Sequence, residues 1–168
     1  MAKDLVEFRD FSIKAKEALE DALIAGLHEA GGELHARTVR NSRQGHKYGD
    51  IQARSLWKYQ VDENKMEAYV GSPYEAGFWE EFGTGEHAQN GDGRKGWWVY
   101  VEGQDSGDGG RTYSTKEEAE ETATFLRSKG LPAHATNGIE PNTPLQRAFK
   151  SSKNAVKAIM ESKLKGMG

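Results

Sequence analysis

The chain has 168 residues, with 23 Lys and Arg against 26 Asp and Glu, and a formal net charge of −3. A chain near ~150 residues is typical of one domain, so we expect a single domain over residues 1–168. The sequence contains no cysteine, which excludes disulfides, thiolate zinc sites and a cysteine nucleophile. No apolar run approaches the about 20 residues of a membrane span, and the acidic N-terminus is unlike a signal peptide. These features predict a soluble protein that folds in a reducing cytoplasm.

Charge is distributed unevenly along the chain. Residues 1–93 hold 11 basic and 17 acidic residues, whereas residues 142–168 hold six basic residues and one acidic residue. An acidic body with a basic C-terminal helix indicates either contact with nucleic acid or a basic face that meets an acidic neighbour, in the same chain or in another copy. We favour the second interpretation, because proteins that bind duplex DNA usually have a basic domain.

Helical periodicity marks both ends of the chain. Apolar or small residues recur every three or four positions over residues 11–40, which predicts one helix with a weak point at Gly31 and Gly32, or two helices. Thr143 and Pro144 predict the N-cap and the first residue of a final helix. The apolar stripe of that helix contains Leu145, Ala148, Phe149, Ser152, Val156, Ile159 and Leu164.

The middle of the chain reads as strands and short helices. Two strands are predicted around a turn at residues 62–65, followed by a helix over residues 72–82 with Pro73 in its first turn. Residues 97–136 predict a β-α-β insertion, with Thr115 as the N-cap of its helix. The predicted fold class is α+β, in which a long N-terminal helix and a C-terminal helix pack on an antiparallel sheet built from residues 51–71 and 97–136.

No motif assembles an enzyme site. Residues 91–96 satisfy G-x-G-x-x-G, but a strand follows them where a nucleotide site needs a helix, so we expect a loop. Glu80, Glu81, Glu86 and His87 lack the spacing of metal ligands, and neighbouring helical residues point about 100° apart. We therefore expect a solvated acidic face, no catalytic residue, no metal and no cofactor, and predict that the protein is not an enzyme.

Four short motifs are more specific. Residues 49–55 approach G-x-L-x-x-S, with Ile51 in place of Leu and one extra residue. Val70, Gly71 and Ser72 begin the pattern V-G-[ST]-x-x-x-Y-A, from which Tyr74 and Ala76 depart by one position. The motif E-F-G-T-G is complete in Glu81, Phe82, Gly83, Thr84 and Gly85. The pattern x-G-x-x-P-x-x-[PA]-[FL]-L-x-x-A-F before the last helix is carried by Gly138, Pro141, Pro144, Leu145 and Phe149, with Gln146 where an apolar or basic residue is usual.

Together these motifs resemble the neck and tail-completion proteins of long-tailed bacteriophages, which are often labelled minor capsid or tail component. The resemblance implies a non-enzymatic virion protein that forms a ring at the head–tail junction or joins the completed tail to the filled head. Its implied partners are copies of itself and other neck, connector or tail proteins, with no membrane, and contact with DNA is not predicted. It would act in the bacterial cytoplasm during assembly and remain at the head–tail junction. Residues 97–135 depart from the shorter members of the family.

The candidate assembly residues combine the motif positions with the basic helix. They are Gly71, Ser72, Tyr74, Glu81, Phe82, Gly83, Thr84, Gly85, Pro144, Lys153 and Lys157. Phe82 is either an apolar interface anchor or a core residue, and the sequence leaves both open. Two other functions stay open. A small hydrolase would need Glu81 and His87 to converge in a pocket. A nucleic-acid-binding module would need one exposed face to carry Lys150, Lys153, Lys157, Lys163 and Lys165.

Overall fold

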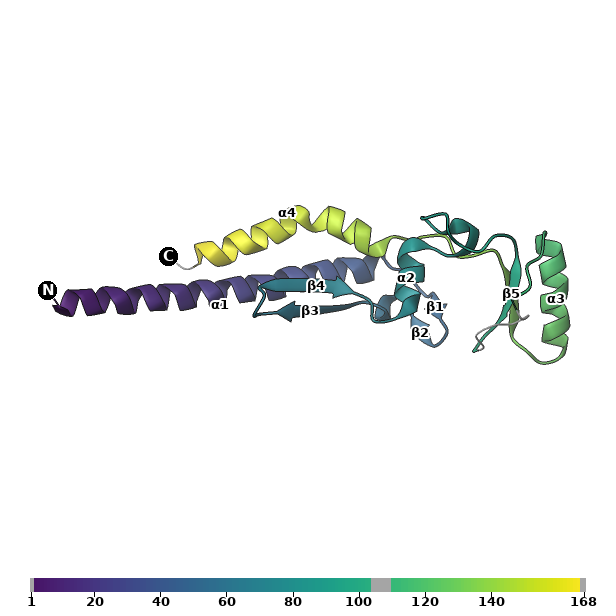
Figure 1. The fold of residues 1–168 in the computed structure, drawn as a ribbon, viewed down its shortest axis with the longest axis horizontal. Coiled ribbons are helices and arrows are strands. Elements are labelled where there is room, and N and C mark those ends of the chain that lie inside the picture. Colours follow the sequence, from purple (N-terminus) through teal and green to yellow (C-terminus); the bar gives the residue numbers. More distant parts are fainter. Residues whose placement is uncertain (1, 104–109, 167–168) are drawn as a thin grey trace.

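The structure, a computed structural model, describes residues 2–103 and 110–166, with side chains in the first helix from residue 13 onward. Two long helices, α1 (Ala2–Asn41) and α4 (Pro144–Lys165), run side by side and antiparallel (Figure 1). The elements between them are β1 (Lys47–Tyr48), β2 (Ile51–Gln52), η1 (Ala53–Ser55), β3 (Lys58–Asp62), β4 (Glu67–Gly71), α2 (Glu75–Phe82), η2 (Gly85–His87), β5 (Trp98–Val101), α3 (Lys116–Ser128) and β6 (Ala133–Thr136). The predicted α+β class is confirmed.

The predicted N-terminal helix is one continuous helix, and its glycines have a packing role. A Cβ on Gly26 would lie 2.7 Å from the sulfur of Met160 on α4, and a Cβ on Gly31 would lie 3.2 Å from the Tyr59 ring on β3. The absence of a side chain therefore lets α4 and the β-hairpin approach α1 closely, which offsets the usual helix penalty of about 1 kcal/mol for glycine. The side chain of Phe11, at the start of the predicted stripe, lies outside the described part.

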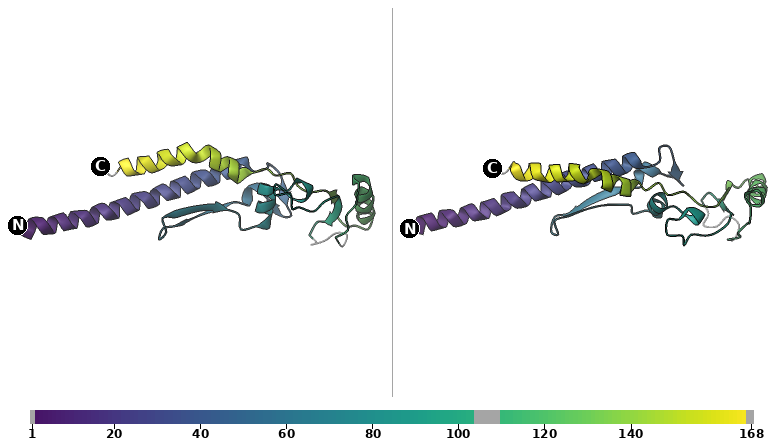
Figure 2. Two further views of the ribbon diagram at one scale, coloured as in Figure 1. Left: turned by 45° about the horizontal axis from the view of Figure 1, so that its top comes forward. Right: turned by 90° about the horizontal axis from the view of Figure 1, so that it is seen from above.

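Strands β3 and β4 form the predicted hairpin, with Lys58 opposite Gly71 and Asp62 opposite Glu67. The turn between them is supported by Asp62, whose Oδ1 accepts a hydrogen bond from the Lys65 N–H at 3.1 Å. The hairpin lies along α1, and α1 in turn packs against α4 (Figures 1 and 2). Helix α2 begins at Glu75, so Pro73 precedes the helix and does not occupy its first turn as predicted.

Strands β5 and β6 and helix α3 pack into one unit, at the end of the molecule that lies opposite the two chain termini (Figure 2). Strands β5 and β6 pair antiparallel, with Val99 opposite Ala135, and Thr115 caps α3 as predicted by accepting a hydrogen bond from the Glu118 N–H at 3.3 Å. The core of this unit is Val99, Val101, Tyr113, Ala119, Ala123 and Ala133. The single predicted sheet is wrong, because the described residues form three separate two-stranded sheets. Helix α3 covers the face of β5 and β6 that carries Val99, Val101 and Ala133, so this strand pair packs into a core of its own and not onto the β3–β4 hairpin. The limits of the insertion stay a prediction.

A second core lies where the end of α1 meets η1, α2 and the start of α4. Its buried members are Tyr48, Ala53, Leu56, Trp57 and Ala76. The Trp57 indole donates a hydrogen bond of 2.7 Å to the Ser42 hydroxyl at the end of α1, which fixes the hairpin to the helix. No helix among the described residues is both long and apolar enough to cross a membrane.

Candidate assembly surface

The E-F-G-T-G motif packs against the segment that leads into α4. The Thr84 N–H donates to the Ile139 carbonyl at 2.9 Å, and the Ile139 N–H donates to the Thr84 hydroxyl at 3.0 Å. Two residues further along the chain, the Glu86 N–H donates to the Asn137 carbonyl at 2.9 Å. These bonds join two motifs that were separate in the sequence, and we call this region the motif junction (residues 81–86 and 137–146).

Gly83 and Gly85 are required at the motif junction for two reasons. Both have positive φ, +74° and +61° respectively, which glycine adopts without the steric cost of a Cβ. In addition, a Cβ would lie 2.7 Å from the Ile139 carbonyl oxygen at Gly83 and 2.2 Å from the Asn137 carbonyl oxygen at Gly85. Positive φ and close backbone approach therefore explain both glycines.

Glu81 caps helix α4. Its carboxylate is buried and accepts hydrogen bonds from the N–H groups of Leu145 at 2.8 Å and Gln146 at 2.9 Å. Thr143 occupies the predicted N-cap position, but its backbone is in the left-handed region (φ 51°) and its side chain makes no capping bond. Pro144 occupies the first turn as predicted and is fully buried. A carboxylate from α2 thus satisfies the free amides and the positive end of the helix dipole of α4.

Glu80 is the second buried carboxylate of α2. It accepts hydrogen bonds from the Arg43 guanidinium at 2.8 Å, the Arg43 N–H at 3.0 Å, the Asn142 amide at 2.6 Å and the Tyr48 hydroxyl. Burial alone would raise the pKa of Glu80, but these hydrogen bonds and the positive charge of Arg43 outweigh it and hold the pKa below its usual value. Burial, followed by the hydrogen bond to Glu80, raises the pKa of the Tyr48 phenol.

The acidic face predicted at Glu80 and Glu81 is therefore wrong. Both side chains are buried, because each has enough donors to replace water. Glu86 does lie at the surface side of the junction, where the Gly96 N–H donates to it at 3.0 Å; this bond, with one from Asn137, lowers the pKa of Glu86. His87 contacts the Asn137 side chain at 3.3 Å. Glu81 and His87 thus have different partners, and no group of three or more metal-binding side chains occurs among the described residues.

Next to the motif junction is a groove of about 520 Å³, which we call the aromatic groove. It is lined by Leu34, Trp57, Val70, Gly71, Ser72, Tyr74, Gly77, Phe78, Glu81, Phe82, Leu145, Gln146 and Phe149. Gly71 ends β4, and the Ser72 hydroxyl accepts a hydrogen bond from the Tyr74 N–H at 3.1 Å in the turn that starts α2. Five of the predicted assembly residues, Gly71, Ser72, Tyr74, Glu81 and Phe82, therefore line one surface.

Apart from the buried Trp57, the aromatic side chains of this groove are open to solvent. Phe78 is 55% exposed, Phe149 57% and Phe82 37%, and the rings of Phe78 and Phe82 are 4.7 Å apart. Phe82 is therefore not a fully buried core residue in the isolated chain. Several apolar rings gathered on one exposed surface are typical of an interaction site rather than of a monomer surface.

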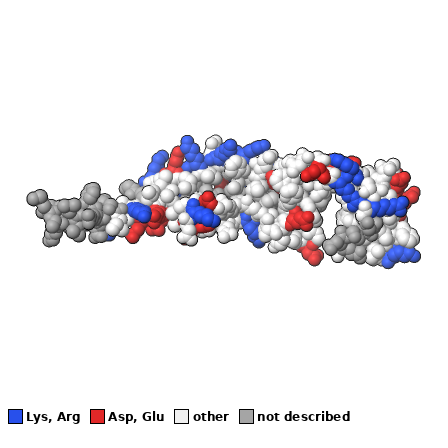
Figure 3. All heavy atoms as spheres, viewed as in Figure 1, with Lys and Arg blue, Asp and Glu red and all other residues white. Residues whose placement is uncertain are grey.

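The lysines of α4 divide into two groups. Lys150, Lys153 and Lys157 are exposed, and Figure 3 shows basic side chains along the edge of the molecule formed by α4. Lys163 instead forms an ion pair with Glu29 of α1 at 2.7 Å. The basic helix thus meets an acidic residue of α1 near its end, whereas Lys150, Lys153 and Lys157 are exposed and contact residues of α4 itself.

The sequence did not reveal the network around Glu80. Arg43, Tyr48 and Asn142 come from three different segments, and none of them belongs to a spaced motif. The one available signal was the presence of two adjacent glutamates in an otherwise apolar segment, W-E-E-F.

Comparison of the chain with models of protein families, with curated proteins and with solved structures finds no match.

Proposed function

We propose that the protein is a non-enzymatic structural component of the head–tail junction of a long-tailed bacteriophage or prophage, where it forms a ring or joins the completed tail to the filled head. The observation that carries the proposal is the motif junction. Two segments that resemble neck and tail-completion proteins are joined there by hydrogen bonds between Thr84 and Ile139, 55 residues apart, and between Glu81 and Leu145, 64 residues apart. Motifs of one family are expected to meet in this way when they maintain one fold.

The aromatic groove supports an assembly role. Exposed aromatic side chains often carry most of the binding energy at the centre of protein interfaces. Tyr74, Phe78 and Phe82 present such side chains beside the motif junction. No arrangement of described residues in the groove supplies a nucleophile with an adjacent base, so assembly fits this surface better than hydrolysis does.

The charge distribution supports association between unlike surfaces. A ring of identical subunits needs two different patches that meet head to tail. Basic side chains gather along α4 (Figure 3), and the rest of the chain has a net negative charge, which favours contact between surfaces of opposite sign. The proposed partners are further copies of the chain and other neck, connector or tail proteins.

An in vitro joining assay tests the proposal. Filled heads and completed tails that lack the protein are mixed with the purified chain, and joined particles are counted by electron microscopy. The combined substitution of Phe78→Ala and Phe82→Ala should abolish joining, while thermal melts show a folded chain. Phe125→Ala is the matched control, because Phe125 is 60% exposed on α3, outside the groove. Full joining by the groove variant would contradict the role of this surface.

DNA binding is a second candidate function, because Lys150, Lys153 and Lys157 are exposed together on α4. The diversion of Lys163 to Glu29 reduces the basic face that this function would use. Proteins that contact several phosphates lose about 10³-fold in DNA affinity between 50 and 200 mM salt. A loss of that size in the affinity of this chain for a DNA duplex would favour DNA binding. Absence of binding at low salt would eliminate it.

A further inference from the structure

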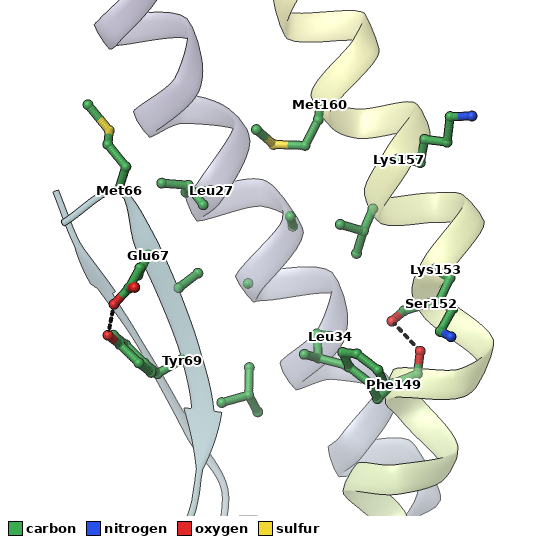
Figure 4. Close-up of a pocket in the computed structure, with 15 residues that line it drawn as sticks. Leu27, Leu34, Met66, Glu67, Tyr69, Phe149, Ser152, Lys153, Lys157 and Met160 are labelled. Carbon is green, nitrogen blue, oxygen red and sulfur yellow. Dashed lines mark hydrogen bonds between the residues drawn. The ribbon is translucent and has the colours of Figure 1, made fainter.

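A second groove runs along the middle of the molecule, and we call it the helix groove. It has a volume of about 620 Å³. Its floor is α1 at Leu27 and Leu34, and its walls are β4 on one side and α4 on the other, as Figure 4 shows. Met66 and Tyr69 line the β4 wall, and Phe149 and Met160 line the α4 wall. The helix groove is continuous with the aromatic groove, because Leu34, Val70 and Phe149 line both.

The start of α1 is largely exposed over residues 13–23, the first whose side chains the structure describes, and we call these residues the projecting segment. It extends past the end of α4 in every view (Figures 1 and 2), and each residue from Ile13 to Leu19 is exposed. The apolar residues Ala15, Ala18 and Leu19 share one face of this segment. Helices in proteins gain most of their stability from packing of such a face, so this segment needs a surface that its own fold does not provide.

We propose that the projecting segment of α1 docks into the helix groove of a second copy of the chain. This inference deepens the proposed function, since it rests on association between copies and names the segment that occupies the surface. Because α1 is one continuous helix, its first turns project away from the groove of their own chain. Docking pairs two different surfaces, the projecting segment and the helix groove, and it generates a ring when each copy docks into the next and the rotation closes.

The dimensions of the two partners agree. The α4 wall from Phe149 to Met160 is about 16 Å long at about 1.5 Å per residue, and the segment from Ile13 to Leu23 is about 15 Å long. The floor contains Gly31, which lies close to the Tyr59 ring: a Cβ on Gly31 would be 3.2 Å from that ring. A helix with small residues such as Ala15 and Ala18 on its contact face suits a groove of this kind.

The charges of the two partners are complementary. Glu17 and Asp21 are one helical turn apart on the projecting segment, are exposed, and form no ion pair within the described residues. Lys153 and Lys157 are also one turn apart, and they line the α4 wall of the groove. Residues spaced by four lie about 6 Å apart on a helix surface, so the acidic pair has the same spacing as the lysine pair. Lys157 has only a loose contact of 3.8 Å to Glu161 in its own chain.

Cysteine cross-linking of the full-length chain tests the docking directly, because the natural sequence has no cysteine. Chains that carry Ala18→Cys are mixed with chains that carry Val156→Cys and are oxidised. The expected result is a disulfide-linked pair of one chain of each kind. Asn154→Cys is the matched control, because Asn154 is exposed on α4 but does not line the groove. Equal cross-linking of Ala18→Cys to both positions, or cross-linking to neither, would overturn the proposal.

Charge reversal gives an independent readout by analytical ultracentrifugation. Lys153→Glu with Lys157→Glu should weaken self-association at least about tenfold, and adding Glu17→Lys with Asp21→Lys to the same chain should restore it. Lys150→Glu, off the groove, should leave association unchanged. If the chain with all four substitutions does not recover self-association, the docking is wrong. If wild-type chain joins heads to tails while its copies neither cross-link nor associate, the docking is wrong and the proposed function stands. If copies cross-link as expected and joining of heads to tails does not need the protein, the docking stands and the proposed function is wrong.

Discussion

The cap that Glu81 supplies to α4 predicts a large and specific loss of stability when it is removed. Glu81→Ala leaves the N–H groups of Leu145 and Gln146, now bonded at 2.8 and 2.9 Å, without acceptors at a partly buried helix end. Loss of an N-cap costs about 0.5–2 kcal/mol, and each buried unsatisfied group about 1–3 kcal/mol. The negative charge at the helix N-terminus contributes about 0.3–1 kcal/mol more. We expect a decrease of about 2–4 kcal/mol in the free energy of unfolding.

Chemical and thermal denaturation of the full chain measure this effect. The expected loss corresponds to a decrease in Tm of about 5–15 °C for a chain of this size. Glu81→Gln keeps one acceptor oxygen and should lose about half as much. Glu75→Ala is the matched control, because Glu75 is exposed on the same helix, and it should cost less than about 1 kcal/mol. A free energy of unfolding for Glu81→Ala within about 0.5 kcal/mol of the wild type would refute the capping role.

Three further perturbations test the rest of the structure. The lowered pKa of Glu80 stabilises the fold above the ordinary value of 4.5, and this contribution is lost as the pH falls below that value; the unfolding free energy of Glu80→Gln should therefore decline less steeply with acid than that of the wild type, and equal slopes would contradict this. Gly85→Ala should lower the free energy of unfolding about 2 kcal/mol more than Gly91→Ala, as measured by urea denaturation. Both glycines have positive φ, but only at Gly85 would a Cβ lie 2.2 Å from a carbonyl oxygen. Equal losses would show that the close approach does not explain Gly85. Thr115→Ala should lower stability by about 1 kcal/mol through loss of the α3 cap, whereas Thr124→Ala, also on α3, should cost less; no difference between them would argue against the cap.

Local patterns in the sequence were sufficient for the elements whose cause is local. Periodicity predicted α1 and α4, and alternation with a turn predicted the β3–β4 hairpin. Thr115 was predicted as a cap because its partner, the Glu118 N–H, is three residues away. Such signals depend on neighbours in the chain, and these the sequence shows directly.

The features that the sequence did not predict all depend on distant partners. Glu80 and Glu81 were expected at the surface, but their donors Arg43, Asn142 and Leu145 lie 37, 62 and 64 residues away. The backbone of Thr143 is left-handed, so the carboxylate of another helix caps α4 in its place. Likewise, the separate core of residues 97–136 depends on how α3 covers its own strands, which no local pattern reveals. Among the assembly residues, the sequence motifs predicted five that line one groove, but not that the groove is open.

Deletion of the gene that encodes this chain tests the central claim most directly, in the phage or prophage that the proposed function predicts. Particles produced after deletion are examined by negative-stain electron microscopy, with and without wild-type chain supplied from a plasmid. The proposed role at the head–tail junction predicts filled heads and completed tails that accumulate separately, and complete virions when the chain is supplied. Complete virions in its absence would contradict the proposed function.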